Sequence, residues 1–315
     1  MDLTPPILLF AVGLVLIVKG GDWFVDSAAW LAEVTGIPKF IVGATIVSVA
    51  TTLPEMIVSV MASLDGMTDM AVGNAVGSVI ANTGLILAIS LIFLPAAISR
   101  KQFSFKGCLL IASCVALLIF ALSGQVTVYA GLVLGLIFLI YIADNLHQGK
   151  SETEIDQRLP FEKKELPRRV LFFLAGAGGI VLGSRLLVDN GSTLARLMGV
   201  PENIIGLTIV AVGTSLPELV TAIASITKKQ GALSVGNIIG ANIIDLALIL
   251  PVCAIVSGGS LPINAQTFTV DLPVCLLLTC LAMVPTMLKG KFRRWQGFAL
   301  LGSYAAYLVF IIMVL

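Results

Sequence analysis

Apolar stretches recur along the chain from Pro5 to Leu315, separated by short polar segments. Each is about 20 residues long, which is enough for a helix to cross a hydrocarbon core about 30 Å thick. The pattern therefore predicts an all-α polytopic membrane protein. Ten transmembrane helices are expected, at approximately residues 5–29, 38–63, 69–95, 105–123, 126–144, 168–195, 202–226, 232–257, 268–288 and 296–314. The first stretch lacks the basic start and cleavage site of a signal peptide, so we expect it to be retained.

An internal repeat divides the chain into two halves, because three segments return after the same interval of 163 residues. The pairs are Gly36–Val47 with Gly199–Val210, Thr51–Glu55 with Thr214–Glu218, and Gly73–Gly77 with Gly236–Gly240. Five spans per half is an odd number, so the second half must enter the membrane from the opposite side. We predict two inverted five-helix repeats, 1–144 and 168–315, with broken helices 2 and 7. Such repeats are common in secondary transporters.

Basic residues concentrate in alternate loops, which predicts the orientation of the chain. The basic loop residues are Arg100, Lys101, Lys106, Lys150, Arg158, Lys163, Lys164, Arg168, Arg169, Lys228, Lys229, Lys289, Lys291, Arg293 and Arg294. We expect both termini outside the cell (inner) membrane and the 145–167 segment to be a cytoplasmic linker loop. That segment mixes acids and bases without an apolar pattern, which favours a flexible linker over a regulatory domain.

Composition agrees with a membrane protein, since only 12% of residues are charged against roughly 25% in soluble domains. The net charge of +1 gives no electrostatic case for a nucleic-acid partner. Five cysteines lie in apolar spans without CxxC spacing, which argues against disulfides and soft-metal sites. His147 falls in the expected central loop, where we expect it to be solvated. The chain has no HExxH, GxSxG or P-loop motif, so we expect neither an enzyme nor a resident cofactor.

Three carboxylic acids lie well inside predicted spans: Glu55, Glu218 and Asp245. A charge there costs at least ~2.5 kcal/mol on insertion scales, so such residues are usually functional. Each glutamate follows a proline, which removes a backbone N–H, kinks the helix and exposes carbonyl oxygens. Hydroxyl groups from Thr51, Thr52, Thr214 and Ser215 lie within one turn. This oxygen-rich set suits hard cations such as Ca2+ or Na+. For single hydroxyls, a purely local bond to the helix backbone is an equally good interpretation.

A second element in each half contains Gly-Asn-x-x-Gly. The glycines permit close helix packing, which suffices to explain them. Ser78, Asn82 and Asp245 follow the second glycine at or about one turn beyond it, so they can share a face directed at the prolines of the preceding span. Asn74 and Asn237 have two open interpretations, as contacts to an ion or as hydrogen-bonding pins for the broken helices.

These paired motifs, Thr-Leu-Pro-Glu and Ser-Leu-Pro-Glu each followed by Gly-Asn-x-x-Gly, resemble the α-repeats of the cation/Ca2+ antiporter superfamily, especially prokaryotic sodium/calcium exchangers. The resemblance implies a Ca2+ site formed by the Glu55 and Glu218 carboxylates with the carbonyls of Thr51 and Thr214. It also implies flanking Na+ sites and a central lining. The first Na+ site would use Thr51, Thr52, Ser78, Glu55 and the Ser48 carbonyl, the second Thr214, Ser215, Glu218 and the Ala211 carbonyl, and the lining Asn82 and Asp245.

The chain departs from that family pattern at three positions. Ala241 replaces a serine that would match Ser78, Thr52 replaces a serine, and Ala50 replaces a glycine. Thr52 keeps its oxygen atom. Ala241 removes a ligand from the second Na+ site, which bears on ion stoichiometry and on the choice of counter-ion.

The sequence therefore predicts an antiporter that exchanges Na+ for Ca2+ by alternating access, with one chain in the lipid bilayer sufficient for transport. An H+/Ca2+ exchanger is the alternative within the same fold. Its signature places asparagine close before the first-repeat glutamate, where this chain has Thr51-Thr52-Leu-Pro. A divalent-cation channel is the alternative from another class. It fits less well, because two inverted repeats already enclose a site within one chain.

Overall fold

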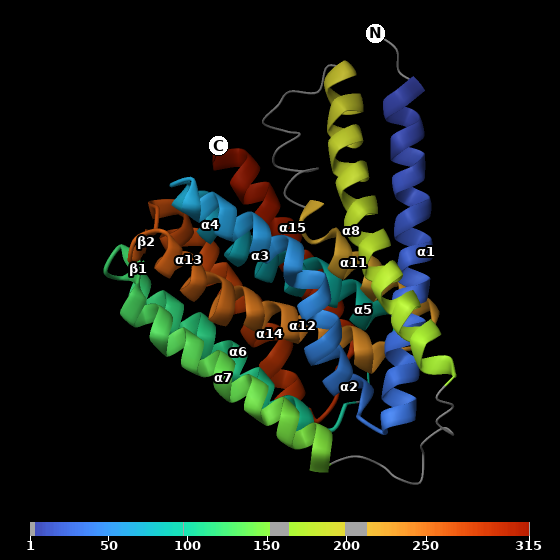
Figure 1. The fold of residues 1–315 in the computed structure, drawn as a ribbon. Coiled ribbons are helices and arrows are strands. Elements are labelled where there is room, and N and C mark those ends of the chain that lie inside the picture. The colour runs from blue at the N-terminus through green and yellow to red at the C-terminus, as the bar shows by residue number, and fades with distance from the viewer. Residues whose placement is uncertain (1–3, 97, 152–163, 199–212, 315) are drawn as a thin grey trace.

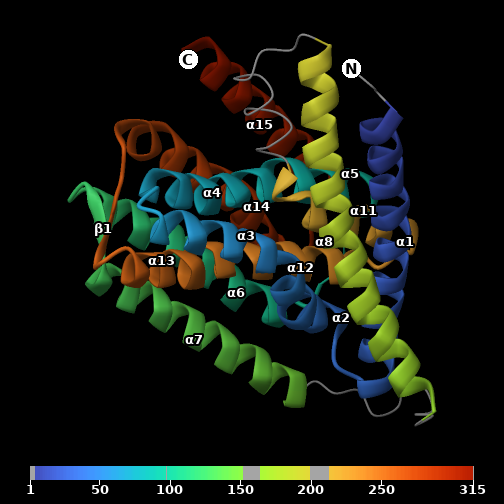
Figure 2. The same cartoon turned by 45° about the horizontal axis from the view of Figure 1, so that its top comes forward.

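The computed structural model describes residues 4–96, 98–151, 164–198 and 213–314. Two long helices, α1 and α8, lie side by side along one flank, and the other helices form a tilted bundle beside them (Figures 1 and 2). The elements of the first half are α1 (Thr4–Thr35), α2 (Lys39–Val42), η1 (Gly43–Val47), α3 (Ser48–Leu64), α4 (Thr68–Ala81), η2 (Asn82–Leu87), α5 (Ala88–Phe93), α6 (Arg100–Ala121), β1 (Gln125–Thr127) and α7 (Val128–Ser151).

The second half repeats the order of the long helices, but β2 follows its third span, whereas β1 follows the fourth span of the first half. Its elements are α8 (Glu165–Leu197), α11 (Leu216–Thr227), α12 (Gly231–Ile244), η5 (Asp245–Ile249), α13 (Leu250–Val256), β2 (Ser260–Pro262), η6 (Thr267–Asp271), α14 (Leu272–Lys289) and α15 (Arg294–Val314). Within the described residues, nine helices are long and apolar enough to cross a membrane, and the shorter α11 lies where the seventh span was predicted. The protein is therefore an all-α polytopic membrane protein, with one small sheet in its loops.

The element boundaries reproduce the repeat seen in the sequence. α4 and α12 begin 163 residues apart, at Thr68 and Gly231, and the π-helical turns η2 and η5 begin 163 residues apart, at Asn82 and Asp245. Identical spacing at the start and end of these helices means that the two halves form the same local structures. In these spans the repeat is therefore present in the structure as well as in the sequence.

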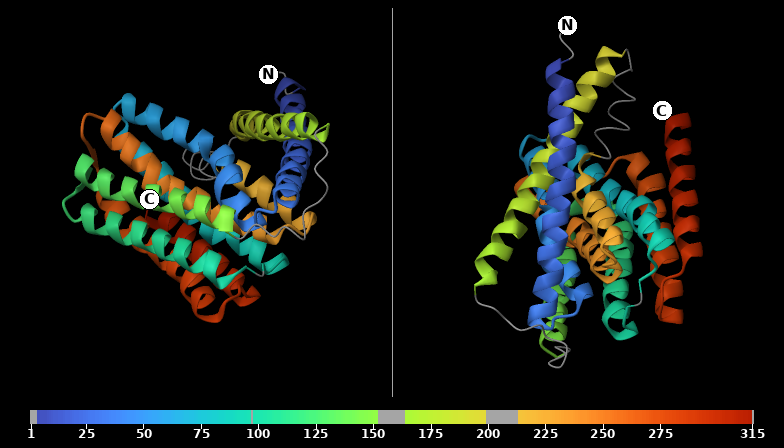
Figure 3. Two further views of the ribbon diagram at one scale, coloured as in Figure 1. Left: turned by 60° about the horizontal axis from the view of Figure 1, so that its bottom comes forward. Right: turned by 90° about the vertical axis from the view of Figure 1, so that its right-hand side faces the viewer.

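Two contacts outside the apolar spans agree with the predicted topology, because each joins segments that it places on the same side of the membrane. β1 pairs antiparallel with β2, which joins the loop after the fourth predicted span to the loop after the eighth. Phe103, near the start of α6, packs edge-to-face against Phe292 at 5.0 Å between ring centroids, which joins the beginning of the fourth span to the loop after the ninth. The start of α1 and the end of α15 also lie toward the same end of the molecule (Figure 3).

The helix interruptions differ from the prediction in position. We expected a break at Pro54, but α3 continues through it, and the second span is interrupted instead by the π-helical turn Gly43–Val47. In the second half, α11 begins at Leu216, so Pro217 occupies the first turn, where a missing N–H leaves no bond unmade. Further π-helical turns interrupt the third and eighth spans, and another begins the ninth span, none of which we predicted. Such turns often occur at functional sites.

The predicted 145–167 loop is shorter than expected. α7 continues to Ser151 and α8 begins at Glu165, so His147 lies exposed on a helix and not in a loop. Residues 152–163 lie outside the described part of the chain. The apolar spans alone set the predicted limits, whereas the helices continue beyond the hydrocarbon core into polar sequence.

Lys106 was also misplaced in the orientation argument, because it is not a loop residue. It lies inside α6 with its side chain fully buried, and its Nζ forms an ion pair with Asp144 of α7 at 2.7 Å. Nζ also donates to the Gln148 side chain at 3.1 Å and lies over the Phe40 ring at 5.7 Å from its centroid. A buried charge requires such partners, so this cluster fastens α6, α7 and α2 together.

Glycines allow α1 and α8 to approach closely along their length. A Cβ at Gly20 would lie 2.8 Å from the Gly176 carbonyl oxygen, and one at Gly183 would lie 2.8 Å from the Gly13 carbonyl oxygen. Lipid chains are as apolar as leucine, so helices in a membrane gain stability mainly from such close packing. The stacked rings of Phe24 and Phe173, 4.6 Å apart, add to this contact.

We predict that Gly176→Ala destabilises the protein and that Gly178→Ala does not. A Cβ at Gly176 would lie 2.7 Å from backbone atoms of α1, whereas one at Gly178 meets no described atom within 4 Å. Overpacking of this kind costs about 1–3 kcal/mol. Thermal unfolding in detergent should show a lower midpoint for Gly176→Ala and an unchanged or higher one for the Gly178 control. Equal midpoints would mean that the two helices are not in close contact.

Candidate ion-binding site

Three carboxylic acids come together at the centre of the bundle. Glu55 of α3, Glu218 of α11 and Asp245 of η5 are each at most 1% exposed. Their carboxyl groups are close enough to interact electrostatically, Glu55 with both of the others. Thr52, one turn before Glu55, donates to Glu218 Oε1 at 3.3 Å, so the two repeats meet at this point. The two glutamates predicted to converge do so.

Most of these carboxyl oxygens have no hydrogen-bond donor among the described residues. Both oxygens of Glu55, both of Asp245 and Oε2 of Glu218 are buried without a partner. Buried polar atoms in native proteins are nearly always paired, and an unpaired one costs about 1–3 kcal/mol. A cluster of unpaired acceptors is therefore a region that a cation would stabilise.

Uncharged oxygens surround the acids. Ser78 of α4, Asn82 at the start of η2 and Ser215 just before α11 are at most 3% exposed, and their side-chain oxygens have no described partner. Thr51 is also buried, and Thr214 is half-buried. The remaining predicted residues are Ser48, which is buried and whose carbonyl accepts from Thr51 at 3.4 Å, and Ala211, which lies outside the described residues.

No three acidic, histidine or cysteine side chains converge tightly enough within the described chain to hold a metal by themselves. A cation in this region would therefore need hydroxyl, amide or backbone carbonyl oxygens besides the carboxylates. Such a mixed set of oxygen ligands suits Ca2+ and Na+ and does not suit soft transition metals.

Asn74 and Asn237 both make hydrogen bonds that hold the broken helices in place. Asn74 Nδ2 donates to the Glu55 carbonyl at 3.3 Å and to the Ser59 hydroxyl at 2.9 Å. Asn237 Oδ1 accepts from Thr51 across the repeats at 3.1 Å. Of the two interpretations left open by the sequence, the described contacts favour pinning for both residues.

The repeat glycines act differently in the two halves. A Cβ at Gly236 would overlap the Phe40 carbonyl, and one at Gly240 would lie 2.5 Å from the Ser48 hydroxyl, so α12 crosses directly over η1. This crossing brings Asn237 to Thr51. No described atom lies within 4 Å of a Cβ at Gly73 or Gly77. Close packing therefore explains the second-half glycines, and the prediction for the first pair stays open.

Sequence reasoning missed a second cross-repeat contact. Asn242 Nδ2 donates to the Thr83 hydroxyl at 2.8 Å, with both residues fully buried. The positions equivalent to these in the other repeat are Val79 and Leu246, so comparison of the halves gave no signal. The useful signal was polarity itself, since few amides occur within apolar spans. Tyr141 was missed in the same way, and its hydroxyl donates to the Ala44 carbonyl in η1.

Comparison with known proteins identifies the family. A family model described as sodium/calcium exchanger protein matches residues 5–145 and 169–313. This chain belongs to the sodium/calcium exchanger family. Inner membrane protein YrbG of Escherichia coli is 34% identical over 313 residues, covering 95% of this chain and 94% of that one. Sodium/calcium exchanger MaX1 of Methanosarcina acetivorans is 28% identical and covers 98% of both chains.

Similarity to solved structures extends over the same length. A structure of the sodium-calcium exchanger NCX_Mj, soaked with 2.5 mM Na+ and 10 mM Sr2+, matches with a TM-score of 0.85 at 28% identity, covering 98% of this chain and 99% of that chain. Membership of the family confirms the resemblance inferred from the Leu-Pro-Glu and Gly-Asn motifs, and the match covers both halves of this family member.

Proposed function

We propose that the protein is a secondary active antiporter that exchanges Na+ for Ca2+ by alternating access. The observation that carries this proposal is the group of buried carboxyl oxygens without donors, contributed by both halves of the chain. Family membership and the printed functions of NCX_Mj and MaX1 support the same exchange. With an inward Na+ gradient, the antiporter would export Ca2+ from the cell.

Charge balance explains why two kinds of ion would compete for one site. Glu55 and Glu218 together carry a charge of about −2 when ionised. One Ca2+ or several Na+ neutralise this charge, but both sets together would give the site a net positive charge. Ionised carboxylates without partners are costly in low dielectric, so an unloaded site resists reorientation. Only loaded states then exchange sides, which couples one ion gradient to the other.

The proposed ion ligands are side-chain and backbone oxygen atoms of this chain. Ca2+ would bind the Glu55 and Glu218 carboxylates and the carbonyls of Thr51 and Thr214. One Na+ site would take Thr51, Thr52, Ser78, Glu55 and the Ser48 carbonyl, and the other Thr214, Ser215, Glu218 and the Ala211 carbonyl. Asn82 and Asp245 would line the centre. The hydroxyls of Ser78 and Ser215, which are buried without described partners, support their inclusion.

We favour Na+ over H+ as the counter-ion for a structural reason as well as from the motif. An exchanger of protons needs only the carboxylates, whereas hydroxyls buried beside them without hydrogen bonds are suited to coordinating Na+. A single chain is sufficient in this scheme, because both glutamates come from one polypeptide. We place the protein in the inner membrane with both termini outside and residues 145–167 on the cytoplasmic side.

We predict that Ca2+ uptake into proteoliposomes follows an outward Na+ gradient when pH is equal on both sides. Vesicles loaded with Na+ should accumulate radioactive Ca2+, and vesicles loaded with choline should not. Uptake that required a pH gradient instead would identify an H+/Ca2+ exchanger. Discrete single-channel currents in a planar bilayer, without any counter-ion, would identify a channel.

We predict that Glu55→Gln or Glu218→Gln abolishes Ca2+ binding measured by isothermal titration of the purified protein. The loss of a paired buried charge typically costs about 3–5 kcal/mol, which is a decrease in affinity of roughly 100-fold or more. Glu33→Gln is the control, since Glu33 is 38% exposed and pairs with Lys39 at the surface. Wild-type affinity in either buried variant would contradict the assigned site.

We predict that Ala241→Ser strengthens the competition of Na+ against Ca2+. Ala241 is fully buried at the position equivalent to Ser78, so serine there would restore a hydroxyl ligand to the second-half site. Titration of Ca2+ at increasing Na+ measures the effect. Ala254→Ser, at a fully buried alanine in α13, controls for the cost of a new buried hydroxyl. Unchanged competition in the Ala241 variant would show that this position does not tune Na+ binding.

A further inference from the structure

A pocket lined by three basic side chains lies between the end of α14 and the start of α15. Its walls are Pro285, Lys289, Lys291, Arg293, Trp295 and Gln296. One membrane span ends at Lys289 and the next begins at Arg294, so the pocket is where two spans leave the apolar core. Phospholipid headgroups occupy this level of the bilayer.

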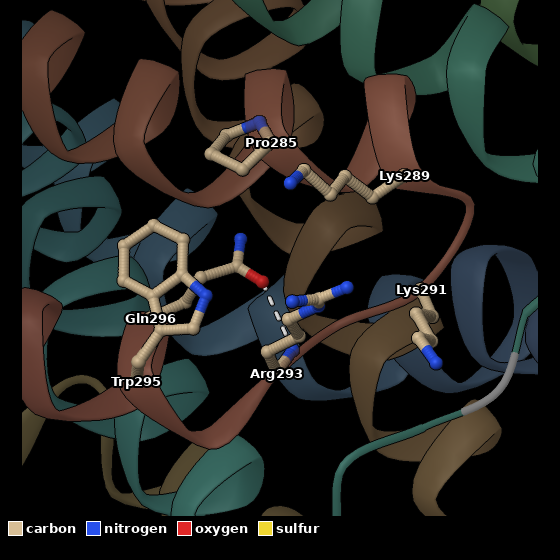
Figure 4. A pocket seen from close by; sticks show the side chains of 6 residues that line it. All are labelled: Pro285, Lys289, Lys291, Arg293, Trp295 and Gln296. Carbon is tan, nitrogen blue, oxygen red and sulfur yellow. Dashed lines mark hydrogen bonds between the residues drawn. The ribbon is translucent and has the colours of Figure 1, made fainter.

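No acidic side chain in the described part of the chain neutralises the positive charges of this pocket. Among the described residues, Lys289, Lys291 and Arg293 form no ion pair, and the sequence contains no Asp or Glu after Asp271. Figure 4 shows the charged ends of Lys289 and Arg293 both extending into the pocket, with the Trp295 ring to one side. Like charges that converge in this way repel each other unless an anion lies between them.

Hydrogen bonds and aromatic packing fix the backbone of the loop that carries these cations. Gln296 is 1% exposed, and its Oε1 accepts from the Arg293 backbone N–H at 2.9 Å. Its Nε2 donates to α14, to the Ala282 carbonyl and to the Thr286 hydroxyl, each at 2.9 Å. Phe292 is buried against Phe103 of α6. The fixed backbone means that the basic side chains start from defined positions and not from a loose loop.

Large apolar side chains border the basic pocket on the helices that form it. Leu288, Trp295 and Phe298 are 68%, 48% and 63% exposed. Trp is characteristic of the membrane interface, where its ring contacts both headgroups and acyl chains. A positively charged cavity beside an apolar surface fits a ligand with a phosphate at one end and hydrocarbon at the other. Free phosphate would gain nothing from the apolar part.

We propose that this pocket binds the headgroup phosphate of an anionic phospholipid, with Lys289 and Arg293 as the direct contacts. Basic pockets at membrane helix ends on the cytoplasmic side are known to hold such headgroups. Basic residues in loops also direct membrane insertion, which accounts for their presence on one face. It does not account for their convergence on a structured pocket. This inference is independent of which ions the protein exchanges.

The test uses Trp295 as the reporter of bound lipid. The chain has three tryptophans, and Trp23→Phe with Trp30→Phe leaves Trp295 as the sole tryptophan, whose fluorescence is excited selectively. The protein is reconstituted in nanodiscs of phosphatidylcholine containing either brominated phosphatidylcholine or brominated phosphatidylglycerol at equal mole fraction. We expect the anionic lipid to quench Trp295 more strongly, with a preference of about fivefold for each contacting basic side chain.

Two variants make the test specific. Lys289→Gln with Arg293→Gln should abolish the preference, and it spares the fold because Gln296 is bonded to the backbone of Arg293 and not to its side chain. Lys164→Gln with Lys229→Gln removes the same charge from exposed positions on the same predicted face and should keep the preference. Equal quenching by the two lipids in the protein with both pocket cations would overturn the proposal. So would a preference that is unchanged in the pocket variant, lost equally in the control, or abolished by millimolar inorganic phosphate.

Discussion

The burial of three carboxylic acids inside a lipid-embedded bundle is the constraint on which the structure depends. Acids at this depth are costly unless the protein encloses them and a counter-charge is available. Glu55, Glu218 and Asp245 meet this condition because each comes from a helix covered by others, and because π-helical turns and Pro-containing segments bring oxygen atoms to the same place. The outer face of α3 carries exposed apolar side chains, among them Val49, Leu53 and Ile57, whereas α12 and η5 are almost entirely buried. The bundle thus holds a small oxygen-lined region inside an otherwise apolar core.

Duplication gives the two halves the same frame but not the same contacts. Thr52 bonds to Glu218, whereas the equivalent Ser215 has no described partner for its hydroxyl. Asn82 in one half is Asp245 in the other, and Ser78 is Ala241. Each difference changes the charge or number of oxygens on one side of the centre. A site with this asymmetry would not bind ions equally in its two halves, which is the physical basis for expecting distinct roles for them.

Outside the central group of acids, the helices are held together in two different ways. The Lys106–Asp144 ion pair joins α6 to α7, and the Tyr141 hydroxyl joins α7 to the Ala44 carbonyl of the second span. α1 and α8 meet instead mainly through glycines and aromatic rings, and the Arg169 guanidinium of α8 lies 5.6 Å from the centroid of the Trp30 ring of α1. Interfaces of glycine against backbone present few interlocking side chains.

By itself the sequence determined the ten apolar segments, the 163-residue repeat and the identity of the acidic residues, because length, period and polarity are local properties of a chain. It could not determine that the second span breaks at Gly43–Val47 and not at Pro54, or that Lys106 is buried. It also could not pair Thr51 with Asn237 or Asn242 with Thr83. The Thr51–Asn237 contact exists because Gly236 and Gly240 let α12 cross directly over η1. The angle and depth of a helix crossing depend on atoms distant in sequence, and only the tertiary structure brings them together.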